Sequence, residues 1–340
     1  FPPQDVLQLK SYYLSSSVHV DSIDYLIGYN YRLHSLDCMN LKSKSVTQIV
    51  LPGDGPDAIV RLSGIYAQSL DSVWISDESE RAFLIDSVGT IKRMIDLKKY
   101  LEDQEQLLIN TNYAMFTSHL FYNASRHSLM FLVKHTPSNT FIVKEAFIDE
   151  VGKMATYQLS SSKVVPDMSK GYAYINFPNV NFVGENIVYN YPVESSIYML
   201  DIRTNERKYI LADSHYTSNI IEKCTTSGDY ATLEKHWLEN SHFYDIMYLP
   251  KYKIYARLHA DKVDFDEKKG MEKLINERDL YLMLFDENME KIGETKLSNC
   301  RYSPFTSWNA TYGGIALFVD NVLDEKNNTD DLTIDIISLK

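Results

Sequence analysis

Apolar and polar residues alternate along most of this chain in short runs, which is the pattern of β-strands that bury one face. Turn-forming residues, mainly Asn, Asp, Gly and Ser, separate the runs, and few stretches show the period of an amphipathic helix. The 25 Tyr and 14 Phe strengthen this interpretation because aromatic side chains favour strands. The pattern therefore predicts an all-β fold.

A repeat of roughly fifty residues, the length typical of a propeller blade, orders these strands. Residues 20–26 (VDSIDYL) resemble residues 70–76 (LDSVWIS), and an apolar residue followed by Asp recurs where we expect a strand to end before a turn. Chance is the alternative, because such pairs are common in all-β chains. The spacing favours four-stranded blades, and it predicts one domain, residues 1–340, folded as a six-bladed β-propeller. The marker occurs at Leu36-Asp37, Ile85-Asp86, Ile148-Asp149, Leu200-Asp201, Phe285-Asp286 and Ile334-Asp335.

The last predicted blade is one strand short. Residues 314–320 and 332–339 precede the end of the chain and leave the outermost position of that blade empty. We expect residues 5–10 to fill it as an N-terminal strand closing the last blade, since this removes an exposed sheet edge. The first two blades are predicted from strands near residues 16–20, 24–30, 32–38, 45–51, 64–69, 72–77, 81–86 and 90–97.

The long connections of this layout all fall on one face of the predicted propeller, which we call the long-loop face. Long loops on a compact fold are usually functional, so we place any binding site here, around the mouth of the central channel. Insertions without function are the alternative, because surfaces tolerate them. Within residues 261–279 the spacing of Met271, Leu274 and Ile275 predicts a short helix. The long connections are residues 98–113, 160–171, 213–241, 262–279 and 321–331.

Four residues on this face are candidates for ligand binding: Trp237, His242, Arg301 and Trp308. Exposed aromatic rings beside Arg suit the stacking and bidentate contacts that sugars and peptides make. We therefore expect an exposed aromatic shelf, with core packing as the alternative for each ring. Trp74 lies within a predicted strand and is expected in the core.

Charge and hydropathy exclude several classes of partner. The chain carries 34 Lys and Arg against 46 Asp and Glu, a net charge of −12, and no basic cluster, so we expect no nucleic acid partner. No run of about 18 apolar residues is present, so we expect no transmembrane segment.

The histidines show no H-E-x-x-H spacing, and we expect neither a metal site nor a cofactor. Cys38, Cys224 and Cys300 are expected to be unpaired and buried.

The acid–base groups expected on the inner strands are few, mainly Asn181, Asp245 and Asn309 with His19 and His119. A hydrolase would need several carboxylates converging near the channel, and the chain has neither a sialidase-type box nor a G-x-S-x-G elbow. The sequence therefore favours a ligand- or partner-binding propeller, with a glycan, peptide or protein as partner, over an enzyme. The alternative is a propeller hydrolase or lactonase with a cation in the channel.

Two stretches carry a resemblance to a known family. The tight turn at residues 53–57 (GDGPD), followed by Ile65-Tyr66 and residues 70–75, resembles the first blades of an uncharacterised family of six-bladed β-propeller lipoproteins of gut Bacteroidetes. Residues 249–257 (LPKYKIYAR) are similar to an aromatic and Arg hairpin in its fifth blade. The resemblance implies an exported, periplasmic or cell-surface lipoprotein, whose lipid anchor would lie outside the given chain. It implies no catalytic residues.

Overall fold

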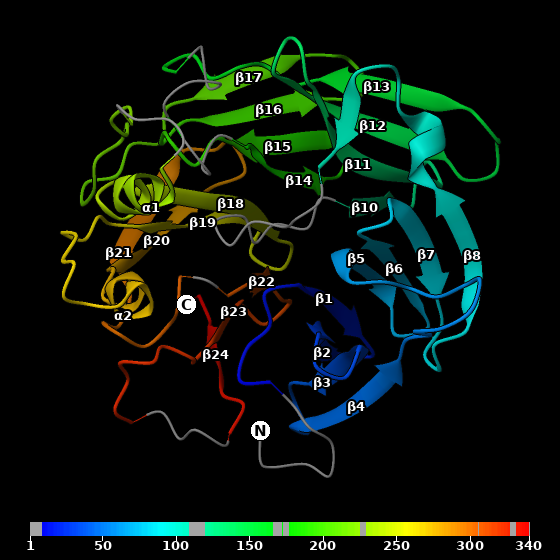
Figure 1. Ribbon diagram of the computed structural model, residues 1–340, viewed down its shortest axis with the longest axis horizontal. Helices are drawn as coiled ribbons and strands as arrows, with labels where there is room; N and C mark the ends of the chain where they lie inside the picture. Colours follow the sequence, from blue (N-terminus) through cyan, green and yellow to red (C-terminus); the bar gives the residue numbers. More distant parts are fainter. Residues whose placement is uncertain are drawn as a thin grey trace.

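The computed structural model describes residues 9–108, 120–165, 172, 177–224, 229–304, 306–326 and 331–339 of the chain. Within them, six antiparallel sheets stand around a common centre like the blades of a propeller (Figure 1). The strands of each blade follow one another in sequence order, and the first strand of each blade faces the centre. The predicted all-β, six-bladed propeller is confirmed.

Burial differs systematically across each of the first three blades. The second and third strands are mostly buried on both faces, because the neighbouring blades pack against them. In the outermost strands β4 and β8, by contrast, exposed residues alternate with less exposed ones. The strands are, in blade one, β1 (Ser15–Val20), β2 (Ile23–Asn30), β3 (Ser35–Asn40) and β4 (Ser45–Val50); in blade two, β5 (Leu62–Ser69), β6 (Ser72–Asp77), β7 (Arg81–Ile85) and β8 (Ile91–Asp96); in blade three, β10 (Leu120–Asn123), β11 (Ser128–His135), β12 (Thr140–Phe147) and β13 (Met154–Gln158).

The last three blades repeat the arrangement, except that the described part of blade six has three strands. Of the strand expected at residues 5–10, only Leu9 and Lys10 are described, and neither is in a strand; the rest of that prediction lies outside the described residues. The strands are β14 (Asn179–Val183), β15 (Asn186–Asn190), β16 (Ile197–Asp201) and β17 (Arg207–Ile210) in blade four; β18 (His242–Leu249), β19 (Ile254–Ala260), β20 (Leu280–Phe285) and β21 (Lys291–Lys296) in blade five; β22 (Trp308–Ala310), β23 (Ile315–Phe318) and β24 (Ile334–Ile337) in blade six.

Four further elements lie in the long connections. The helix expected from the apolar spacing is confirmed as α2 (Met271–Asn276), with Leu274 and Ile275 buried. The 3₁₀ helix η1 (Leu97–Tyr100), strand β9 (Glu105–Leu107) and helix α1 (Tyr230–Leu238) are not predicted by the sequence pattern. Strand β9 pairs with β11 beside β10, which gives blade three a fifth strand.

The core consists of six apolar clusters, one between each pair of neighbouring blades. Trp74 belongs to the cluster between blades two and three, where its ring stacks on Tyr122. It is buried, as expected. This division of the core means that each blade is stabilised mainly by its two neighbours.

Blade six is joined to blade one by the segment that precedes β1. Tyr12 is fully buried there: its hydroxyl donates to Asp37 Oδ2 at 2.6 Å in blade one, and its ring packs against Phe318 of blade six. The backbone N–H of Ser307 donates to the Tyr12 carbonyl at 3.1 Å. A Cβ at Gly28 would come within 2.5 Å of the Tyr12 ring, so only glycine leaves room for this closure.

The three cysteines form no disulfide with one another. Cys38 is buried in β3, and burial raises its pKa to about 12, whereas Cys224 and Cys300 are partly exposed. The expectation that all three are buried is therefore wrong for two of them.

We expect a thiol reagent at pH 8 to modify Cys224 and Cys300 in the native protein, and Cys38 only after unfolding. The reagent attacks the thiolate, and the raised pKa of Cys38 should make its reaction at least about a hundredfold slower. Reagent titration with and without denaturant measures this. A Cys38→Ser variant should lose only the slow thiol; equal native rates for three thiols would contradict the assignment.

Candidate functional site

A cavity of about 380 Å³ lies at the centre of the ring. The inner strands of all six blades line it: β1, β5, β10, β14, β18 and β22. At one end it reaches Gly184 and Pro250, in the turns that follow β14 and β18. Those turns belong to the face opposite the long-loop face. The volume is within the range of small-molecule sites, so the channel itself is the candidate site.

The polar side chains on the channel wall mostly bond to one another or to the backbone. Asn309 Nδ2 donates to Ser15 Oγ at 2.7 Å, and Ser15 also shares a hydrogen bond with Ser307. Ser17 donates to the carbonyl of Ala310 at 2.5 Å. These contacts join β1 of blade one to β22 of blade six. They stabilise the wall and engage these side chains within the protein.

Asp245 is the only charged residue among the described residues that line the channel. Trp308 donates from Nε1 to Asp245 Oδ1 at 2.8 Å, and no described Lys, Arg or His forms an ion pair with this carboxylate. Burial raises the pKa of Asp245 to about 6, an effect that the Trp308 hydrogen bond opposes. The carboxylate is thus charged at pH 7 without a cation beside it.

A break in the strand ladder accompanies this position. Phe243 pairs with His259 and Ile246 with Arg257, so Tyr244 and Asp245 of β18 lie opposite one residue of β19. This is a β-bulge, a feature that redirects a side chain and that is common beside functional sites. It interrupts the alternation of β18.

A second, smaller cavity of about 20 Å³ lies next to the channel. Asp245, Ser307 and Trp308 line both cavities. The small cavity has room for about one water molecule. The Asp245–Trp308 pair therefore lies between the channel and this smaller space.

The exposed aromatic shelf expected from the sequence is absent, because both tryptophans are buried: Trp237 is 7% exposed and Trp308 4%. Trp308 begins β22, and its Nε1 is held by Asp245. Trp237 lies in α1 rather than in an irregular loop, and the Arg278 guanidinium covers its ring. The alternative, core packing, holds for both rings, although Trp308 also borders the channel.

The other two candidates lie apart from the channel lining. His242 is 1% exposed, accepts a hydrogen bond from Trp237 at 3.4 Å, and has its pKa lowered to about 3 by burial. Arg301 makes a bidentate ion pair with Asp335, at 2.6 and 3.0 Å. Its guanidinium is therefore engaged within blade six. Of the four predicted residues, only Trp308 contacts the candidate site.

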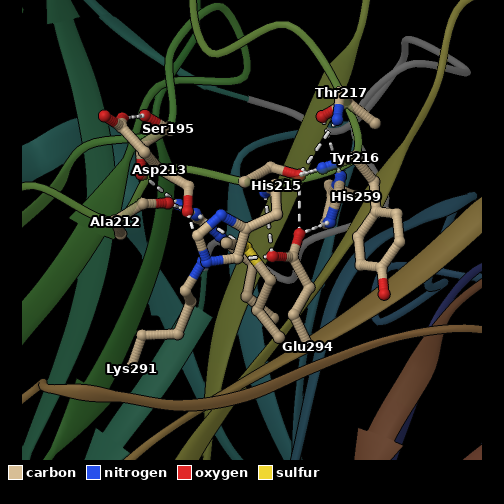
Figure 2. Close-up of polar contacts among 12 residues, drawn as sticks. Ser195, Ala212, Asp213, His215, Tyr216, Thr217, His259, Lys291 and Glu294 are labelled. Carbon is tan, nitrogen blue, oxygen red and sulfur yellow. Dashed lines mark hydrogen bonds and ion pairs between the residues drawn. The ribbon is translucent and has the colours of Figure 1, made fainter.

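A second concentration of polar groups lies between blades four and five (Figure 2). The fully buried Arg257 of β19 donates to the carbonyls of Ser195 and Ala212 at 2.7 and 3.0 Å. Its guanidinium also lies against the rings of Phe243 and Phe285. Burial lowers the pKa of Arg257 to about 9, so it remains charged at pH 7.

Glu294 of β21 is the acceptor at the centre of the same cluster. It receives hydrogen bonds from His259, Ser214 and the backbone N–H of His215, and Lys291 pairs with it at 3.1 Å (Figure 2). Burial raises the pKa of Glu294, but the hydrogen bonds outweigh this effect and hold the pKa well below its usual value. None of these residues lines either cavity. We interpret the cluster as a polar network that holds blade four and blade five together.

The donor groups of the described residues do not form a metal site. Nowhere in that part of the chain do three His, Cys, Asp or Glu side chains come close enough to hold one ion. In the channel, Asp245 is a single carboxylate.

Comparison with known proteins is consistent with this architecture. The sequence profile of a domain of unknown function, DUF4221, matches residues 4–296. The crystal structure of a DUF4221 member from Bacteroides vulgatus superposes with a TM-score of 0.71 at 14% identity, covering 100% of this chain and 96% of that one. A protein from Bacteroides fragilis, named as a candidate exported protein, gives a TM-score of 0.57 at 13% identity, over 97% and 90% of the two chains.

No curated protein matches the sequence. Among the described residues, no helix is long and apolar enough to cross a membrane.

Proposed function

Because the chain belongs to the DUF4221 family, whose function is unknown, we propose from its own geometry that it is an exported ligand-binding propeller whose ligand occupies the central channel. The observation that carries this proposal is the cavity of about 380 Å³ lined by all six inner strands. A space of this size suits a small molecule or the end of a longer one.

Binding rather than catalysis is supported by the composition of the wall. General acid–base or metal-assisted hydrolysis requires several ionisable groups around one reacting atom. The described channel lining offers Asp245 as its one carboxylate, held on one side by Trp308. A glycan, a peptide and a segment of a partner protein are all candidate ligands for a recognition site of this kind.

Filling the channel tests the proposal. In a thermal-shift screen of glycans, peptides and small metabolites, we expect hits that raise the melting temperature of the wild type but not that of Ala310→Trp. Ala310 lines the cavity, so the larger ring should occupy the space that a ligand needs. A ligand at a hundred times its Kd stabilises a protein by about 2.7 kcal/mol, which such a screen detects.

Ala231→Trp is the matched control, because Ala231 is exposed on α1, away from the channel lining. Met247→Trp offers a second way to fill the cavity if Ala310→Trp does not fold. Hits that stabilise the channel-filled variants as strongly as the wild type would refute a channel site.

Export is supported by the Bacteroides fragilis relative and by the resemblance to exported lipoproteins. Protease digestion of intact cells, compared with that of lysed cells, tests this part of the proposal.

A further inference from the structure

We infer that the ligand of the channel presents a primary ammonium group, or a similar organic cation, to the carboxylate of Asp245. The inference rests on the proposed binding function and specifies the chemistry of the ligand. It starts from an imbalance in the site: a single negative charge on the described wall has no positive partner there. A cationic ligand would supply that partner.

Several other polar side chains of the wall are already engaged within the protein, whereas Asp245 keeps acceptor capacity. Asn309, Ser15 and Ser17 are engaged in contacts within the protein. Asn181 donates to the carbonyl of Ile246 at 2.9 Å. An ionised carboxylate accepts about four hydrogen bonds, and Trp308 supplies one to Asp245. Asp245 can therefore accept further hydrogen bonds from a donor-rich cation.

Aromatic rings around the channel add a second attraction for a cation. Tyr66, Phe121, Phe182 and Tyr248 line the cavity together with Trp308. The face of an aromatic ring attracts an ammonium group, and the attraction strengthens where water is excluded. The net charge of −12 also raises the local concentration of cations around the protein.

An organic cation fits this site better than a metal ion does. Calcium takes about six to eight oxygen ligands, and magnesium about six, usually from more than one carboxylate or from phosphates. The described lining has one carboxylate. A primary ammonium group needs about three acceptors, and its carbon chain can lie against the aromatic rings.

The test is calorimetric titration at pH 7 with primary amines that differ in their second functional group, namely 1,5-diaminopentane, agmatine and lysine amide. Matched neutral and anionic probes are 1,5-pentanediol and glutarate. We expect at least one amine to bind, the diol and glutarate not to bind, and Asp245→Asn to weaken amine binding about tenfold or more. Asp264→Asn, which removes an exposed carboxylate outside the lining, should bind as the wild type does.

The pH dependence gives a further readout. With a carboxyl pKa of about 6, Asp245 is mostly ionised at pH 7 and mostly protonated at pH 5. Amine affinity should fall about tenfold between these values in the wild type and stay level in Asp245→Asn.

The possible failures are distinguishable. Absence of amine binding, equal binding of the diol, or unchanged amine affinity in Asp245→Asn would overturn the inference about the cation. If glycans or peptides then bind the wild type but not Ala310→Trp, the channel remains a binding site for neutral ligands. If no probe distinguishes Ala310→Trp from the wild type, the proposed function itself fails.

Discussion

Replacing Arg257 with alanine should lower the free energy of unfolding by about 3–5 kcal/mol, the cost typical of breaking a buried charged network. The substitution removes a fully buried guanidinium and leaves the carbonyls of Ser195 and Ala212 without their donors. It also leaves a void beside Phe243 and Phe285. Denaturant unfolding followed by far-UV circular dichroism measures the change.

Arg203→Ala is the control for Arg257→Ala, because Arg203 is exposed in the turn after β16. A surface substitution of this kind should stay within about 0.5 kcal/mol of the wild type. If Arg257→Ala also unfolds within about 1 kcal/mol of the wild type, the cluster in Figure 2 does not fasten blade four to blade five.

Replacing Asp245 with asparagine should have the opposite effect and stabilise the protein at neutral pH. Asparagine has nearly the same shape and can still accept the hydrogen bond from Trp308, but it carries no charge to bury. The pKa of Asp245 is about 6 in the folded protein, against the ordinary value of 3.8 for an aspartate side chain. That difference corresponds to about 3 kcal/mol at pH 7, the largest gain expected from this change.

The stability difference between Asp245→Asn and the wild type should depend on pH. Folding raises the pKa of Asp245, so the protonated side chain adds to the stability of the folded protein. This contribution to the free energy of unfolding is complete below pH 3.8 and is lost as the pH rises through about 6. The stabilisation of Asp245→Asn should therefore be largest at pH 7 and shrink towards pH 4. His242, with a pKa of about 3, destabilises both proteins as the pH falls below 6.5, so its effect cancels in the difference.

Melting temperatures of the wild type and Asp245→Asn between pH 4 and 7 check this prediction, with Asp264→Asn as the surface control. A lower melting temperature for Asp245→Asn at pH 7 would show that the charge is stabilised in the folded protein. If the variant is more stable yet loses amine binding, Asp245 is a group retained for binding at a cost in stability.

The sequence predicts the blades well because turns and alternation are local properties. Four of the six apolar–Asp pairs lie at the end of a blade's third strand or directly after it. In blades two and five the reason is visible: Asp86 Oδ1 accepts from the backbone N–H groups of Val88 and Thr90, and Asp286 Oδ1 does the same for its own turn. At Asp37 and Asp335 the pair lies near the start of its strand, so there the marker does not indicate a turn.

The site is harder to predict because it depends on contacts between blades. Asp245 can be assigned to an inner strand from the sequence, but the bulge that displaces it from the regular ladder is set by packing against β19. Trp237 and Trp308 are expected to be exposed from the sequence because they are assigned to the connections before blades five and six. In the structure the Arg278 side chain covers the first, and Asp245 of a neighbouring blade holds the second. Neither partner is close in sequence.

The way the ring closes has a consequence for folding order. Most blade contacts are hairpins between successive strands, which form quickly because little chain entropy is lost. Ser15 and Ser307, whose hydroxyls meet at the junction of blades six and one, are 292 positions apart. Their contact requires the last blade to dock on the first, so the complete channel wall is among the last features to assemble. During refolding, strand content should return before the channel can hold a molecule.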